Sequence, residues 1–266
     1  MSTVQKKCST APFFEVLPEF WLFPCCKSDA CSVFFAFGAD MSQISGILEK
    51  LEGTSVYDVL VNMEEAYERI SEEQGSWYDK AKFTCPSGCG QCCENFEPDL
   101  FECEALYMAA WMLENQREVA LQIAEGKFPF EKAKGCQLFN PDSPYHCTIY
   151  QGRAFICRLF GAASSYSKDG RKSWKPCKFY PSSVLASHTP PLEHRQYSEA
   201  ETLNVLGAVP PAMSDLMQSA LSFIPDSERT VLIRDILPAT IKKLMWLMNM
   251  NGNDNPNGTP NAPMAA

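Results

Sequence analysis

The stretch that decides how this chain folds is CPSGCGQCC, residues 85–93, which places four cysteines within nine positions. Thiolates two or three residues apart can converge on one metal ion, because a turn of the backbone brings their sulfur atoms together. Gly88 and Gly90 supply the conformational freedom that such a loop needs, since glycine tolerates positive φ. Four thiols that merely filled a hydrophobic core would need neither the glycines nor the proline between them. The segment therefore predicts a metal site.

A second, more widely spaced group of cysteines follows. Cys136 stands after a glycine, Cys147 and Cys157 lie within the run CTIYQGRAFICRLF (residues 147–160), and Cys177 comes last. Soft sulfur ligands select zinc, Cu(I) or an iron–sulfur cluster, and they exclude magnesium and calcium. The two groups together indicate a thiolate-rich centre.

The order and local spacing of these cysteines resemble the YkgJ-like cysteine-cluster family, whose members are described as zinc- or iron-chelating or as containing iron–sulfur clusters. The shared pattern is C-x3-C-x2-C-C, a lone cysteine, C-x2-Y-x2-R-x3-C-R-x-F and a last cysteine, over residues 81–180. Ala154 departs from it, since the family commonly has proline there. The resemblance implies eight thiolate ligands: Cys85, Cys89, Cys92, Cys93, Cys136, Cys147, Cys157 and Cys177.

Eight thiolates could form two four-coordinate sites, or one cluster and one zinc ion. Adjacent Cys92 and Cys93 rarely bind one ion together, which favours two neighbouring centres. Arg153 and Arg158 are either ordinary surface arginines or residues that offset the negative charge and donate hydrogen bonds to sulfur. Tyr150 is expected to pack around the site rather than react.

Two further side chains compete for a ligand role. Cys103 lies on the apolar stripe of an expected helix, and a buried helical cysteine is more often a small apolar residue than a ligand. His146 abuts Cys147 and could replace a thiolate, although the family-like pattern does not require it.

Composition narrows the class of protein. The 266 residues contain 32 acidic and 23 basic side chains, giving a net charge of −9, which argues against nucleic acid or an anionic membrane surface as a partner. No apolar run is long enough to span a bilayer, and the N-terminus is a poor export signal. Thirteen cysteines, an odd number, are therefore expected in a reducing, cytoplasmic setting rather than in a disulfide scaffold.

Apolar periodicity predicts a mainly α fold, in which helices surround an irregular, loop-rich cysteine core with little strand. Helices are expected near 54–73 (ended by Gly75), 99–125, 199–222 and 228–248. The expected segments are an atypical extension at 1–40 (disordered, or preceding a true start at Met41), a helical segment at 41–80, the cysteine-cluster domain at 81–180, a helical segment at 181–248 and a disordered tail at 249–266.

Three functions are compatible with this pattern. The first is a metal-binding protein, redox-active or not, whose iron–sulfur cluster or zinc organises the middle of the chain. The second is an enzyme that uses the cluster for electron transfer or methyl transfer, since a related cysteine motif occurs in flagellin lysine N-methylases. The third is a structural zinc module for partner binding. No Gly-x-Gly-x-x-Gly loop and no convincing acid–base pair supports the second.

Overall fold

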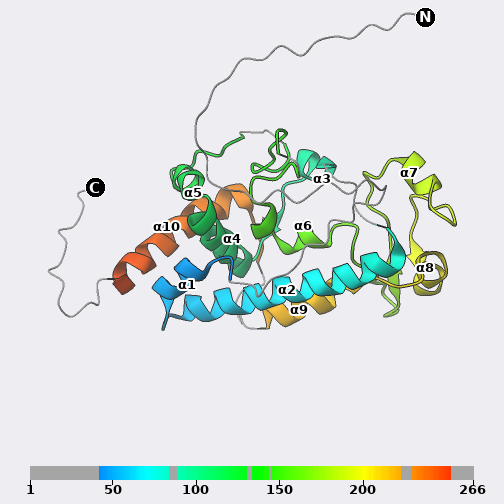
Figure 1. The fold of residues 1–266 in the computed structure, drawn as a ribbon, viewed down its shortest axis with the longest axis horizontal. Helices are drawn as coiled ribbons and strands as arrows, with labels where there is room; N and C mark the ends of the chain where they lie inside the picture. The colour runs from blue at the N-terminus through cyan, green and yellow to red at the C-terminus, as the bar shows by residue number, and fades with distance from the viewer. Residues whose placement is uncertain (1–41, 84–88, 131–133, 144, 223–228, 253–266) are drawn as a thin grey trace, which may run out of the picture. The chain divides into compact units, whose positions relative to one another are not determined.

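The computed structural model describes residues 42–83, 89–130, 134–143, 145–222 and 229–252. Over these residues the chain forms ten α-helices, one 3₁₀ helix and five short strands, which confirms the mainly α class with little strand (Figure 1). None of the described helices is both long and apolar enough to cross a membrane. The atypical extension predicted at 1–40 lies outside the described residues.

Helices greatly outnumber strands along the described chain. The helices are α1 (Ser45–Leu51), α2 (Ser55–Ala81), α3 (Gln91–Asn95), α4 (Glu102–Asn115), α5 (Arg117–Ala124), η1 (Tyr150–Gly152), α6 (Phe155–Leu159), α7 (Ser182–Ala186), α8 (Glu199–Leu206), α9 (Met213–Leu221) and α10 (Ile233–Gly252). The strands are β1 (Asp99–Leu100), β2 (Ser165–Tyr166), β3 (Lys172–Trp174), β4 (Tyr197–Ser198) and β5 (Val231–Leu232).

Helix α2 is the longest element and runs past both hydrophobic clusters of the molecule. It begins at the side-chain cap Thr54, whose hydroxyl accepts from the N–H of Tyr57. The predicted end at Gly75 is wrong, because the helix continues to Ala81. Trp77 extends the buried stripe, and burying so large a ring outweighs the roughly 1 kcal/mol that a helical glycine costs.

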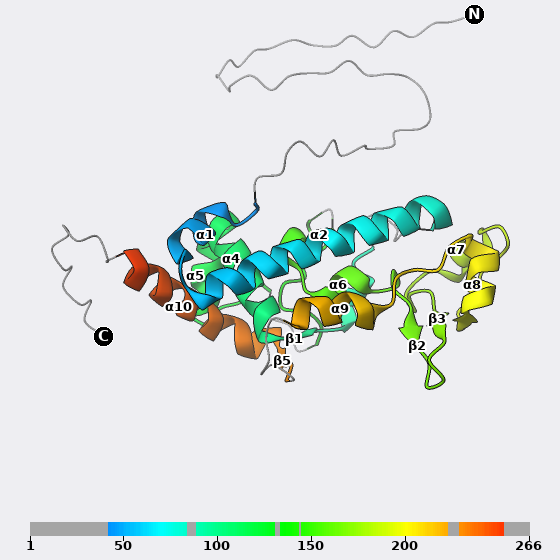
Figure 2. The ribbon, with the colours of Figure 1, turned by 90° about the horizontal axis from the view of Figure 1, so that it is seen from below.

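The first hydrophobic cluster forms where α1, α4, α5 and α10 gather around the first half of α2 (Figure 2). Helix α4 is buried continuously from Cys103 to Leu113, as expected of a helix that is apolar on every side. Helix α10 packs against α4 and α5, and α1 packs against α10. Strand β1 pairs antiparallel with β5 and joins the start of α4 to the start of α10.

The second hydrophobic cluster is smaller and mostly aromatic. Trp77 from α2 meets Trp174 from β3, and the ring of Phe83 lies edge-on to Trp174, with centroids 5.4 Å apart. Strands β2, β3 and β4 form an antiparallel sheet at this end, with α7 and α8 beside it (Figure 2). The cysteine-rich segments run between the two clusters.

Three other predicted helices differ from the structure. The one expected at 99–125 is β1 followed by α4 and α5, with a break at Gln116, whose side chain donates to the carbonyl of Thr148. The one at 199–222 is divided into α8 and α9, because Gly207 (φ 69) ends α8 before Pro210 and Pro211. Helix α10 starts later than predicted and continues into the expected tail as far as Gly252; residues 253–266 lie outside the described ranges.

Candidate metal centre

Helix α3 begins in a left-handed turn at Gly90 (φ 55), which places Cys92 and Cys93 in its first turn. The side chain of His146 packs directly on this turn, since a Cβ at residue 90 would lie 2.5 Å from the Cβ of His146. Glycine satisfies both conditions, positive φ and the close approach of a neighbour.

The sulfur atoms of Cys92 and Cys93 lie 3.8 Å apart and share a hydrogen bond. This hydrogen bond lowers the pKa of Cys92 to about 6 against the effect of burial, and the charge of Arg153 acts in the same direction. The same hydrogen bond, together with burial and the charge of Cys92, raises the pKa of Cys93. The pair therefore keeps one proton near neutral pH, and a cation that binds both sulfurs must displace it.

A backbone contact joins the first cysteine group to the second. The N–H of Cys136 donates to the carbonyl of Cys93 over 2.9 Å. Gly135 precedes it with φ 85, and a Cβ there would lie 2.3 Å from the carbonyl oxygen of Glu94. The two groups, about forty residues apart in sequence, are thus held together by the backbone itself.

Three of the predicted ligands share one local hydrogen-bond pattern. The backbone N–H two residues further along donates to each sulfur: Leu138 to Cys136 (3.4 Å), Ile149 to Cys147 and Phe179 to Cys177. Such N–H groups favour the thiolate and tune a bound metal. Burial acts in the opposite direction and is stronger, so that the pKa of Cys136 rises to about 12 and those of the other two also rise. A cation must therefore replace the proton.

Helix α6 carries Cys157, and a glycine turn after it approaches Cys177. Burial, followed by the charges of Cys136 and Cys147, raises the pKa of Cys157 well above its ordinary value. Gly161 (φ 76) lies so close to Cys177 that a Cβ at residue 161 would be 3.0 Å from the Cβ of Cys177. The last predicted ligand is therefore held against the turn that follows α6.

These segments enclose one cavity of about 310 Å³. Seven of the eight predicted ligands line it: Cys89, Cys92, Cys93, Cys136, Cys147, Cys157 and Cys177. Tyr150, Arg153 and Arg158 line it as well. Cys85 lies outside the described residues. The structure brings together every predicted site residue that it describes.

Other groups stand apart from this cavity. Cys103 is fully buried in the first hydrophobic cluster and is not among the lining residues, and His146 is likewise absent from the lining. In the described part of the chain, no three His, Cys, Asp or Glu side chains already have a metal-holding arrangement. The donor set nevertheless suits a thiophilic metal, because it combines convergent thiols, N–H groups directed at sulfur and cationic side chains.

The two arginines carry positive charge to the cavity wall without a carboxylate partner. Arg158 donates from Nε to the carbonyl of Arg153 over 3.0 Å, donates to that of Gln151, and stacks on the ring of Tyr67 at 3.9 Å. Arg153 donates to the carbonyl of Tyr150 and stacks on its ring at 3.7 Å. Neither forms an ion pair with an Asp or Glu in the described residues, and both line the same cavity as the predicted thiolate ligands.

Sequence reasoning missed three side chains that hold α6 in place. Glu104 accepts from the N–H of Phe155, Gln74 donates to the carbonyl of Arg158, and the ring of Tyr67 packs on both residues. One signal was available for Glu104, which is a polar residue within the helix predicted at 99–125, whereas Gln74 follows the helix predicted at 54–73. Such a residue is usually hydrogen-bonded when buried, yet its partner cannot be read from sequence.

Comparison with known proteins gives one match, which covers the cysteine-rich part of the chain. No curated protein and no solved structure matches the chain. One family model does match, CxxCxxCC, described as "Putative zinc- or iron-chelating domain", over residues 84–184, which contain all the predicted ligands. Residues 84–184 are therefore similar to the CxxCxxCC domain, and the YkgJ-like resemblance is consistent with this match.

Proposed function

We propose that the cavity holds a polynuclear, thiolate-ligated metal centre, with an iron–sulfur cluster as its resident form. The convergence of seven predicted ligand cysteines on a single cavity carries this proposal. Cys85, four residues before Cys89, is proposed as the eighth member of the set.

Size and charge favour a cluster over isolated zinc ions. A volume of about 310 Å³ is roughly ten times the share of one water molecule in the liquid, far more than one metal ion occupies. Two zinc ions with four thiolates each would place four negative charges beside only two guanidinium groups, Arg153 and Arg158. A cluster bound by four thiolates leaves the other cysteines as neutral thiols, which costs less in a mostly apolar cavity.

When bound, an iron–sulfur cluster supplies one-electron transfer, so the proposed function includes a redox role. The residues that line the cavity would neutralise the charge of this cluster, donate hydrogen bonds to it and shield it from water. Arg153 and Arg158 would offset thiolate charge, and the N–H groups near Cys136, Cys147 and Cys177 would donate to ligand sulfurs. Tyr150, stacked between Arg153 and Tyr145, would shield the centre from water.

Anaerobic purification followed by measurement of iron, zinc and acid-labile sulfide tests the proposal. We expect iron and sulfide in similar amounts, and their loss in Cys89→Ser and Cys157→Ser but not in the matched control Cys103→Ser. Zinc without acid-labile sulfide would show that the cavity holds zinc sites instead of a cluster. A wild-type protein that binds neither metal, or equal retention in all three variants, would overturn the assignment.

A further inference from the structure

A buried carboxylate joins the beginnings of two helices beside the cavity. Glu104 is only 2% exposed. Its Oε2 accepts from the N–H of Phe101, the residue before α4, over 2.9 Å, and its Oε1 accepts from the N–H of Phe155, the first residue of α6, over 2.7 Å. A carboxylate this deeply buried is retained only where hydrogen bonds compensate for its lost hydration.

Helix α6 needs such support because a helix of five residues is not stable by itself. Its other end is held by Gln74 of α2, whose Nε2 donates to the carbonyl of Arg158 over 2.7 Å. Between these two contacts, the ring of Tyr67 lies edge-on to that of Phe155. Cys157 and Arg158, which line the cavity, are therefore oriented by side chains of α2 and α4 rather than by α6 itself.

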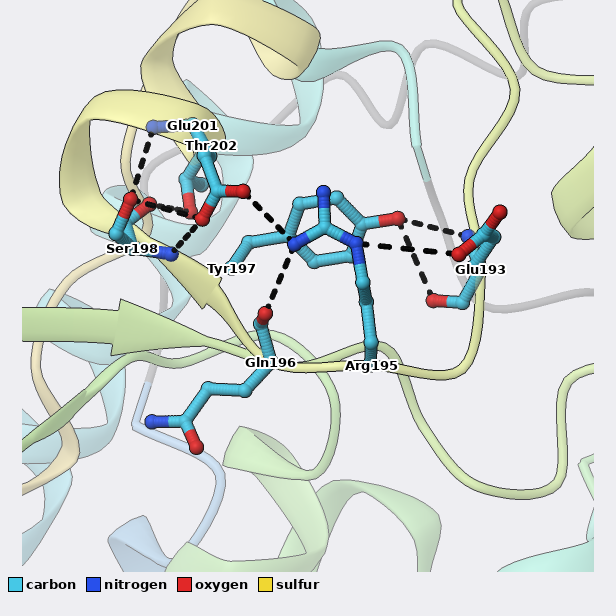
Figure 3. A network of polar contacts seen from close by, with 7 residues as sticks. All are labelled: Glu193, Arg195, Gln196, Tyr197, Ser198, Glu201 and Thr202. Atoms are coloured by element: carbon cyan, nitrogen blue, oxygen red, sulfur yellow. Dashed lines mark hydrogen bonds and ion pairs between the residues drawn. The ribbon is translucent and has the colours of Figure 1, made fainter.

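Helix α8 shows that the second contact of Glu104 is not needed to cap a helix. Glu201 accepts from the N–H of Ser198 over 2.8 Å, just as Glu104 accepts from Phe101 (Figure 3). Its other oxygen, however, accepts from Arg195 at the surface (Figure 3). The two glutamates share the local cap and differ in what the second oxygen holds: a surface arginine in α8, and the segment that bears Cys157 in α4.

We propose that Glu104, with Gln74 at the opposite end of α6, is a positioning residue of the metal centre, which sets metal affinity by fixing Cys157 without touching the metal. This inference rests on the proposed function. It predicts that Glu104 affects metal affinity only through the position of Cys157. Removing that ligand should therefore remove the effect.

A double-mutant cycle tests this dependence. Cobalt(II) serves as the probe, because thiolate sites accept several metals and cobalt bound to thiolate absorbs visibly. The full chain is titrated anaerobically as wild type, Glu104→Gln, Cys157→Ser and the double variant, with Glu201→Gln as the matched control. We expect Glu104→Gln to weaken cobalt binding by about ten- to a hundredfold, as is usual for residues that support ligands. Glu201→Gln should leave it unchanged, and in the Cys157→Ser background Glu104→Gln should add less than about threefold.

Gln74→Met extends the test should Glu104→Gln fail to fold, since it frees the other end of α6 with little change of volume. The same dependence on Cys157 is expected. Unchanged affinity in Glu104→Gln and Gln74→Met, or an equal loss with and without Cys157, would overturn the positioning role and leave the proposed function standing. A wild-type chain that binds no cobalt, zinc or iron would instead overturn the proposed function, and this inference with it.

Discussion

Replacing Gly135 with alanine tests the backbone junction on which the centre is built. Gly135 has φ 85 and directly precedes Cys136. A methyl group there would lie 2.3 Å from the carbonyl oxygen of Glu94 and 2.9 Å from that of Cys93. These are backbone atoms, which cannot rotate away as the end of a flexible side chain can. The methyl group must therefore push Cys136 away from α3.

Gly126 provides a matched control, because it has nearly the same backbone angle (φ 82) but a Cβ added there would meet no atom within 4 Å. Alanine in a left-handed conformation costs about 1–2 kcal/mol at either site. Overpacking at residue 135 adds about 1–3 kcal/mol. We therefore expect Gly126→Ala to lower the free energy of unfolding by about 1–2 kcal/mol and Gly135→Ala by about 2–5 kcal/mol.

Urea denaturation of the metal-free proteins measures both costs, provided that the slope m is unchanged. The difference between the variants isolates the contact, since any effect of alanine on the unfolded chain is common to both. Metal content should fall in Gly135→Ala alone, because only this variant separates Cys136 from Cys93. Equal destabilisation by the two substitutions, with equal metal content, would refute the close approach and the junction inferred from it.

Three further predictions follow from the buried groups. Cys157→Ser should release metal and Cys103→Ser should retain it, as measured by elemental analysis of anaerobically purified protein. Burial raises the pKa of Glu104 from 4.5 to about 7, so the stability that its proton provides is complete below pH 4.5 and is lost as the pH rises through 7. The stability of wild type relative to Glu104→Gln should therefore fall by about 3 kcal/mol over that range in denaturant titrations, and a flat difference would contradict the buried carboxyl. Chelation of the metal should alter the near-ultraviolet circular dichroism of the Trp77–Trp174 pair, whereas an unchanged spectrum would show that the second cluster is independent of the centre.

Much of the fold could be predicted from local patterns. The apolar stripe of α2 and the long buried run of α4 dominate their segments, so helix type was predictable there. The positions at which helices end were less predictable. The end of α2 depends on Trp77 meeting Trp174, almost a hundred residues away, and the break at Gln116 depends on the carbonyl of Thr148. Contacts of this range leave no periodic signal in the sequence.

The cavity was predictable for a different reason. Cysteine is a rare residue type with narrow chemistry, so its spacing carries information that common residues do not. The supports behind the ligands could not be predicted in the same way. Glu104 resembles any acidic residue in the first turn of a helix until the fold places Phe155 beside its second oxygen. The cysteines that line the cavity could thus be named from the sequence, whereas the side chains that support them could be found only in the structure.

The predicted ligands also lie between the two hydrophobic clusters, so a metal bound by them would have a structural role. Cys136 belongs to the first cluster, while Cys177 packs against the second. Helix α2 already joins the clusters, and a metal bound by both groups of cysteines would add a second connection between segments far apart in sequence. The free energy of metal binding would then stabilise the arrangement that presents both groups, because only that arrangement offers all the ligands at once. The first cluster has its own large buried set, so loss of metal should lower the free energy of unfolding of the second cluster and the cysteine segments as one unit, while that of α4 and α10 stays unchanged.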